Sequence, residues 1–208
     1  MSTFADVAPI AALEAYAARV GAGLMADTID PVGIPNRWSH AVLAYRDGPR
    51  AWPEEQIKRF SKVVCISVTG DPAMAQHARE LDDELYDATP QAAPVWVDAR
   101  TAAGHQDATL YTDRDNLVKM WPYLGGRRPR LHIATLDNYP WTPHQLAAEI
   151  QATYGLALDP AWIWAIQCFA AGQRVAWADI SLVWGKRDYW NPQSSSPNDG
   201  GTDVAAAG

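Results

Sequence analysis

The sequence predicts an α/β fold, a single compact (β/α)8 barrel of the TIM type. Its 208 residues suit one domain with a sizeable core. Short apolar runs alternate with helical segments, and several runs are apolar throughout, as strands covered on both faces should be. If the stretch LDDEL at 81–85 supplies a further short strand, the strands number eight. The other strand candidates are residues 22–28, 41–47, 63–69, 108–112, 131–137, 164–169 and 178–184.

An amphipathic helix is expected at residues 8–21. Ile10, Leu13, Ala17 and Val20 recur at helical spacing, and Gly21 ends the pattern. We expect this apolar face to pack on the barrel. The predicted organisation is an N-terminal helix at 1–21, a barrel at 22–190 and a polar, glycine-rich disordered tail at 191–208.

Capping signals predict three helices between the strands. One opens after Trp52 and ends near residue 60. In the second, Thr89 is the expected N-cap, with Pro90 at the first helical position and an end at Gly104. The third starts with a capping box at 142–145 and ends at 155. An open doubly wound sheet is the alternative fold, but no glycine-rich phosphate loop follows the first strand.

Composition restricts the function classes. A net charge of −7 and a pI near 5.1 argue against a nucleic-acid surface. No apolar stretch has the length of a membrane span, and the first 21 residues lack the basic start of a signal peptide. Cys65 and Cys168 lie in apolar runs, so we expect two buried, unpaired thiols. No Cys/His cluster has metal-ligand spacing, and no metal or cofactor is expected.

Residues 71–86 allow two interpretations. Met74, Ala78, Leu81 and Leu85 follow helical spacing, and a helix would leave its acidic residues in solvent. A barrel instead needs a strand here. In that case the side chains of residues 82 and 84 point into a cleft, while Asp83, of opposite parity, faces away.

Polar side chains end several of the strand candidates. In a barrel these ends converge on one face, where active sites lie. Carboxylates gathered there match what glycosidic cleavage needs, namely a proton donor and a group that stabilises the developing cation. The polar residues at these ends are Asp27, Tyr45, Asp47, Tyr111 and Asp137.

Several short blocks occur together in one order along the chain. They are ADT at 26–28 followed by IP at 34–35, AYRDGPRAW at 44–52, LDDELYDATPQAAPVWV at 81–97, ATLYT at 108–112, AIQC at 165–168 and DIS at 179–181. Together they resemble the glycoside-hydrolase-like barrel proteins of actinobacteria and their phages, distant relatives of the family 25 lysozymes. The resemblance covers about residues 22–184, and its middle block is the most specific part.

The resemblance implies roles for individual residues. Glu84 would donate the proton to the glycosidic oxygen, with a pKa raised by burial and neighbouring carboxylates. Asp82, Asp27 or Asp179 would stabilise the oxocarbenium-like state or orient the substrate acetamido group. The groups expected to hydrogen-bond the sugar are Tyr45, Tyr111 and Gln167. Asp47 and Asp137 are further expected sugar-binding residues.

The implied function is a phage-encoded, peptidoglycan-directed glycoside hydrolase of the muramidase type. The sequence departs from the family pattern at Ala26, at Leu85-Tyr86 and at Cys168. The alternative is therefore a catalytically degenerate barrel that binds the cell wall or serves as a virion tail protein. Expected partners are cell-wall glycan and other phage tail proteins. The expected location is the host cytoplasm until lysis, or the virion, with action at the wall.

Overall fold

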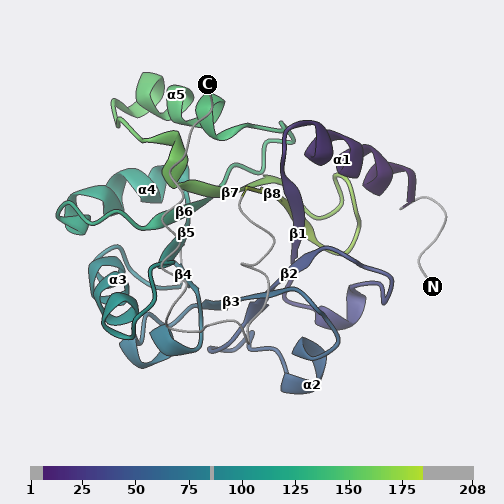
Figure 1. The fold of residues 1–208 in the computed structure, drawn as a ribbon, viewed down its shortest axis with the longest axis horizontal. Coiled ribbons are helices and arrows are strands. Elements are labelled where there is room, and N and C mark those ends of the chain that lie inside the picture. The colour runs from purple at the N-terminus through teal and green to yellow at the C-terminus, as the bar shows by residue number, and fades with distance from the viewer. Residues whose placement is uncertain (1–6, 85–86, 185–208) are drawn as a thin grey trace.

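The computed structural model describes residues 7–84 and 87–184, which form a closed barrel of eight strands seen end-on in Figure 1. Each of the seven apolar runs overlaps one strand, and residues 80–82 supply the short fourth strand. The helical interpretation of residues 71–86 is therefore wrong. The strands are β1 Gly23–Asp27, β2 Ala41–Tyr45, β3 Val63–Ser67, β4 Glu80–Asp82, β5 Thr109–Asp113, β6 Arg130–Ala134, β7 Ile163–Phe169 and β8 Asp179–Val183.

The prediction of a (β/α)8 barrel of the TIM type is wrong, because the sheet is mixed and helices are few. Strands β1 to β7 pair in parallel, whereas β8 runs antiparallel to both β7 and β1. The described α-helices lie outside the ring in Figure 1. They are α1 Val7–Arg19, α2 Glu54–Ile57, α3 Ala92–Ala102, α4 Arg114–Met120 and α5 Pro143–Tyr154.

Connection length explains this difference. Parallel neighbours need a crossover of a dozen or more residues, but only residues 170–178 link β7 to β8. A link of that length suits an antiparallel pair, so β8 reverses. The two shortest links between parallel strands, residues 28–40 and 68–79, form 3₁₀ turns in place of α-helices, at Pro31–Gly33 and Pro72–Gln76.

Helix ends follow the capping chemistry in part. Helix α5 has the expected capping box, in which the Thr142 hydroxyl accepts from the Gln145 amide, and Gly155 ends it in the left-handed conformation. The N-cap prediction at Thr89 is wrong. Helix α3 begins two residues later than expected, after Gln91, because the carbonyl of Thr89 first closes a turn with the amide of Ala92.

Helix α1 packs on the barrel as predicted. Leu13 and Ala17 are buried in the main core cluster, and Ile10 lies against it. The Tyr16 hydroxyl donates to the carbonyl of Pro140 at 2.7 Å, which joins α1 to the loop after β6. The predicted barrel end at 185–190 and the predicted tail at 191–208 lie outside the described residues.

The two cysteines are unpaired, as expected. Cys168 is fully buried, and burial raises the pKa of its thiol to about 12. Cys65 is only half-buried, so the prediction of burial is confirmed for one thiol and not for the other.

The barrel interior is polar at its centre. Hydrogen bonds join side chains of strands that are not neighbours in the sheet, so these side chains must point into the lumen. Such bonds connect β5 to β7, β7 to β1, β4 to β6 and β6 to β8. The outer faces of the same strands carry apolar residues, including Leu81, Leu110 and Ile180, which pack in the main core cluster.

Candidate active site

Acidic side chains gather where the parallel strands end. Asp27 is the last residue of β1, and Asp179 is the first residue of β8. Because β8 is reversed, its first residue lies at the same end of the barrel, and the two aspartates are register partners. The reversal of β8 therefore still brings Asp179 beside Asp27.

A hydrogen-bonded chain spans the lumen beneath this end. The Tyr111 hydroxyl donates to Gln167 Oε1 at 2.5 Å, and Gln167 Nε2 donates to Asp27 Oδ2 at 2.9 Å. Tyr45 is a further hydrogen-bond partner of Asp27. Four of the predicted site residues, from β1, β2, β5 and β7, are thus held together.

The short strand β4 contributes the remaining acids. Asp82 is 1% exposed, and its Oδ1 has no hydrogen-bond partner within the described residues. Glu84 follows β4, is half-buried, and its carboxyl is a hydrogen-bond partner of the Tyr111 hydroxyl. Residues 82 and 84 therefore point to the same end as Asp27, as the strand interpretation requires.

Burial raises the pKa values of these carboxyl groups. Burial and then the nearby Asp179 raise the pKa of Asp27 to about 6. Burial and then Glu84 raise the pKa of Asp82 to about 9, and burial and then Asp113 raise the pKa of Glu84 to about 7. Near neutral pH the group accordingly contains protonated and ionised carboxyls side by side, the condition for acid and base roles.

Asp83 does not lie in solvent. It is 1% exposed, and its Oδ2 has no hydrogen-bond partner in the part of the chain that the structure describes. Burial, followed by repulsion from Asp113, raises the pKa of Asp83 to about 7. A substitution at Asp83 would therefore perturb a buried carboxyl, so it is unsuitable as a surface control.

Two predicted sugar-binding residues are already engaged by protein donors. Asp47 accepts from the hydroxyls of Ser67 and Thr69 and from the amide of Val68, at 2.5–2.7 Å. Asp137 accepts from Trp141 Nε1 at 2.9 Å. Within the described residues, neither is joined by hydrogen bonds to the group around Asp27, and their role in substrate binding stays a prediction.

Sequence reasoning missed three buried polar residues one layer below the carboxyls, namely Glu80, His132 and Ser181. Strand parity could have indicated the first and last, because Glu80 lies two residues before Asp82 and Ser181 two after Asp179. No comparable signal marked His132.

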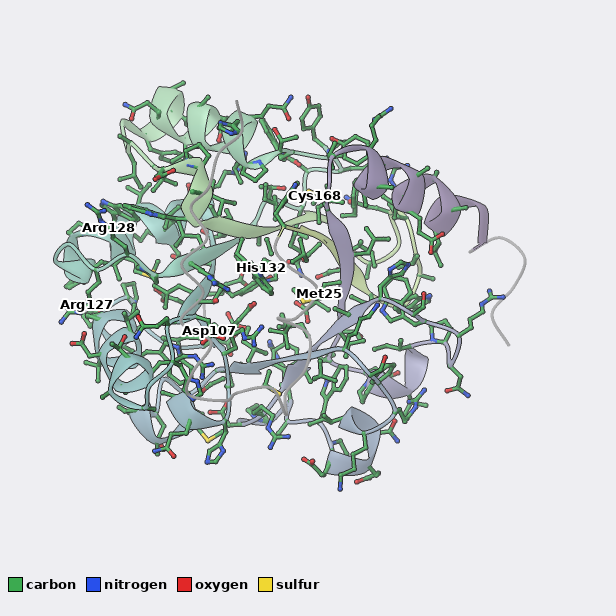
Figure 2. The ribbon with its side chains drawn as sticks, in the orientation of Figure 1. Met25, Asp107, Arg127, Arg128, His132 and Cys168 are labelled. Atoms are coloured by element: carbon green, nitrogen blue, oxygen red, sulfur yellow. The ribbon has the colours of Figure 1, made fainter. Side chains whose placement is uncertain are left out.

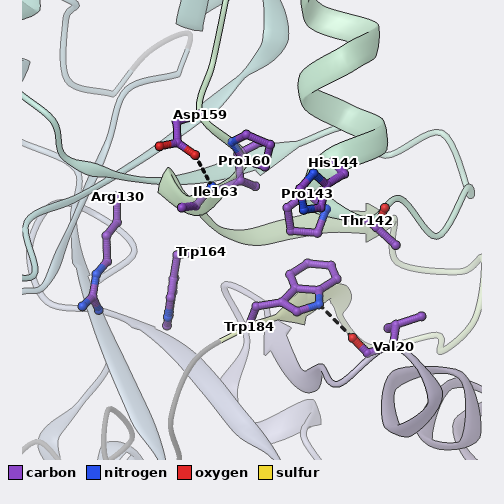
Figure 3. Close-up of a pocket in the computed structure, with 11 residues that line it drawn as sticks. Val20, Arg130, Thr142, Pro143, His144, Asp159, Pro160, Ile163, Trp164 and Trp184 are labelled. Carbon is purple, nitrogen blue, oxygen red and sulfur yellow. Dashed lines mark hydrogen bonds between the residues drawn. The ribbon is translucent and has the colours of Figure 1, made fainter. Parts of the chain in front are cut away.

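A separate pocket of about 800 Å³ lies at the opposite end, beside the first residues of β6 and β7 (Figure 3). Trp164, Trp184 and Arg130 line it, and it contains none of the predicted site residues. Within the described residues, no group of three or more His, Cys, Asp or Glu is arranged to hold a metal ion. None of the described helices combines the length and apolar character needed to cross a bilayer.

No protein-family model and no curated protein matches this sequence. One solved structure is similar over 86% of this chain and 93% of its own, with 10% identity and a TM-score of 0.47. It is described as a glycosyl hydrolase 25 of Streptococcus pneumoniae, a virulence factor participating in host cell invasion. A similarity at this level does not identify an activity, and it does not bear on a phage or actinobacterial origin.

Proposed function

We propose that the chain is a glycoside hydrolase of the lysozyme type that acts on cell-wall glycan, with Glu84 as the proton donor. The observation that supports this best is the group of Asp27, Asp82, Glu84 and Asp179 at one end of the barrel. The pKa values of Asp27, Glu84 and Asp82 are about 6, about 7 and about 9. Glycosidic cleavage needs one protonated and one ionised carboxyl at the same bond.

Each carboxyl suits a different task. Glu84 is less buried than Asp82 and Asp83, and its pKa of about 7 lets it hold a proton near neutral pH. Asp27, whose pKa of about 6 is the lowest of the three, would be ionised and would stabilise the oxocarbenium-like state. Asp82, with a pKa of about 9, stays protonated and would donate a hydrogen bond to the substrate acetamido oxygen.

The test is turnover of purified peptidoglycan by the wild-type chain and by Glu84→Gln. The substitution keeps the size of the side chain but removes the transferable proton, so release of reducing ends should fall about 10²–10⁴-fold. Mass spectrometry of borohydride-reduced products identifies the sugar at the new reducing end, which separates muramidase from glucosaminidase cleavage.

Glu55→Gln is the matched control, because Glu55 is exposed on α2 and should leave turnover unchanged. No turnover by the wild type between pH 5 and 8, or equal turnover by the two variants, would refute the proposal. Sedimentation with peptidoglycan in the absence of any turnover would instead indicate a wall-binding barrel.

A further inference from the structure

Three buried side chains form a hydrogen-bonded chain across the barrel lumen. Glu80 Oε2 lies 2.9 Å from His132 Nδ1, and His132 Nε2 lies 2.9 Å from Ser181 Oγ. The three residues come from β4, β6 and β8, and each is 0% exposed. Figure 2 shows His132 inside the ring of strands.

An acid, an imidazole and a hydroxyl in this order resemble the triad of serine hydrolases. A nucleophile must reach its substrate, however, and the hydroxyl of Ser181 is completely enclosed. The chain is therefore a structural connection through the lumen and has no substrate of its own. Its role follows from its contacts with the cluster of carboxyl side chains at the end of the barrel.

The buried chain contacts the candidate active site at several points. His132 and Tyr111 are register partners on neighbouring strands, with ring centroids 4.7 Å apart and planes at 79°. Ser181 on β8 and Gln167 on β7 are register partners. Tyr111 and Gln167 are the two residues that lead by hydrogen bonds to Asp27.

Two layers therefore stack in the lumen. The upper layer, from β1, β5 and β7, ends at Asp27, and the lower layer comes from β4, β6 and β8. Such layers from alternate strands fill small barrels. Glu80 and Ser181 are also the same-face neighbours of Asp82 and Asp179, so the lower layer links the strands that carry these carboxyls.

We propose that His132, held between Glu80 and Ser181, is a positioning residue that fixes the hydrogen-bonded chain from Tyr111 through Gln167 to Asp27 and favours the ionised form of Asp27. The kinetic part of this inference rests on the proposed hydrolase function. The titration part does not, because the ionisation of Asp27 can be followed in the free protein.

Electrostatics give the direction of the effect. Burial and then Asp179 raise the pKa of Asp27, whereas His132 lowers it, as do the hydrogen bonds from Gln167 and Tyr45. Removal of the imidazole therefore raises this pKa above its value of about 6. The charged or titratable groups that interact with Asp27 or His132 from the surrounding strands are Tyr45, Glu80, Asp82, Glu84, Tyr111 and Asp179.

The experiment is a carboxyl ¹³C NMR titration of the full chain labelled at aspartate, with Asp27→Asn used to assign the Asp27 signal. In His132→Gln the titration midpoint of Asp27 should rise by about half a pH unit or more. Ser181→Ala removes only the hydroxyl partner of the imidazole and should raise the midpoint by less. His77→Gln, at an exposed histidine, should leave the midpoint unchanged.

Kinetics on peptidoglycan provide the second measurement. In His132→Gln, kcat should fall at least about twofold at pH 6 with KM little changed, because a rise of about half a pH unit roughly halves the ionised fraction of Asp27. The acidic limb of the pH profile should move upward with Asp27, while the alkaline limb, assigned to Glu84, should stay in place. A purely structural role would lower activity without moving one limb.

An unchanged Asp27 midpoint in folded His132→Gln would overturn the inference. If that variant does not fold, the Ser181→Ala titration decides, and an unchanged midpoint there overturns the inference equally. If the wild type shows no turnover, the proposed hydrolase function fails, but the titration still tests the coupling of His132 to Asp27.

Discussion

The side-chain amide of Gln167 donates to the carboxylate of Asp27 at 2.9 Å, across 140 positions of sequence. Gln167 lies on β7 and Asp27 ends β1, with the reversed strand β8 between them in the sheet. This bond therefore crosses the lumen rather than following the sheet. It fixes one oxygen of a carboxyl whose burial already raises its pKa.

Tyr111→Phe should destabilise the protein, because it leaves Gln167 Oε1 buried without its donor. An unsatisfied buried acceptor lowers the free energy of unfolding by about 1–3 kcal/mol, measurable by urea denaturation. Tyr154→Phe is the matched control, since its hydroxyl bonds Asp115 at the exposed surface and should change stability by less than about 0.5 kcal/mol. Equal effects of the two substitutions would contradict the assigned role of Tyr111.

Asp82→Asn should stabilise the protein at alkaline pH. The pKa of Asp82 is raised to about 9 in the fold, so the unfolded chain releases its proton at lower pH than the native state. The free energy of unfolding of the wild type therefore falls as pH rises from about 4 to about 9. Asparagine carries no such penalty, and the gain at pH 8 should be at least about 1 kcal/mol.

Thermal unfolding at pH 4 and pH 8 measures this gain, which should vanish at the lower pH. Asp98→Asn serves for comparison, because Asp98 is exposed and Arg127 lowers its pKa. A stability difference between Asp82→Asn and the wild type that does not depend on pH would show that Asp82 is not a protonated buried acid.

Seven of the eight strand positions could be predicted, because each of these strands overlaps a short apolar run with clear ends. The short strand β4 could not be separated from a helix by periodicity, since only Glu80–Asp82 pair in the sheet. The apolar pattern does not give the direction of β8, because a buried strand has the same pattern whether it runs parallel or antiparallel. The connection does indicate the direction, because residues 170–178 are too few for a parallel crossover.

The cluster of polar residues at the barrel end was predictable in part, because polar residues at strand ends converge wherever parallel strands close into a barrel. The structure does bring Asp27, Tyr45, Tyr111 and Gln167 together there. His132 was not predictable in the same way. A single histidine within an apolar strand reveals its partners only when strands distant in sequence are brought to face each other across the lumen.

Leu13→Ala should destabilise the protein by about 2–3 kcal/mol, because it opens a cavity between α1 and the barrel. Urea denaturation measures the loss, and Val95→Ala provides the control, because Val95 is 50% exposed on α3. If Val95→Ala lowered the free energy of unfolding as much as Leu13→Ala does, or if neither substitution lowered it, α1 would contribute no packing energy.

Turnover should follow a bell-shaped dependence on pH with a narrow maximum. If Glu84 donates the proton, the rate falls as pH rises through its pKa of about 7, because the acid is lost. If Asp27 must be ionised, the rate also falls as pH drops below about 6. The maximum of kcat/KM on peptidoglycan should therefore lie between about pH 6 and pH 7, and the limbs belong to an interacting set of carboxyls.

In Asp27→Asn the acidic limb should disappear together with most of the activity, while the alkaline limb of the residual rate persists. A profile flat from pH 5 to pH 9, or an acidic limb that survives in Asp27→Asn, would exclude this assignment of the two carboxyls.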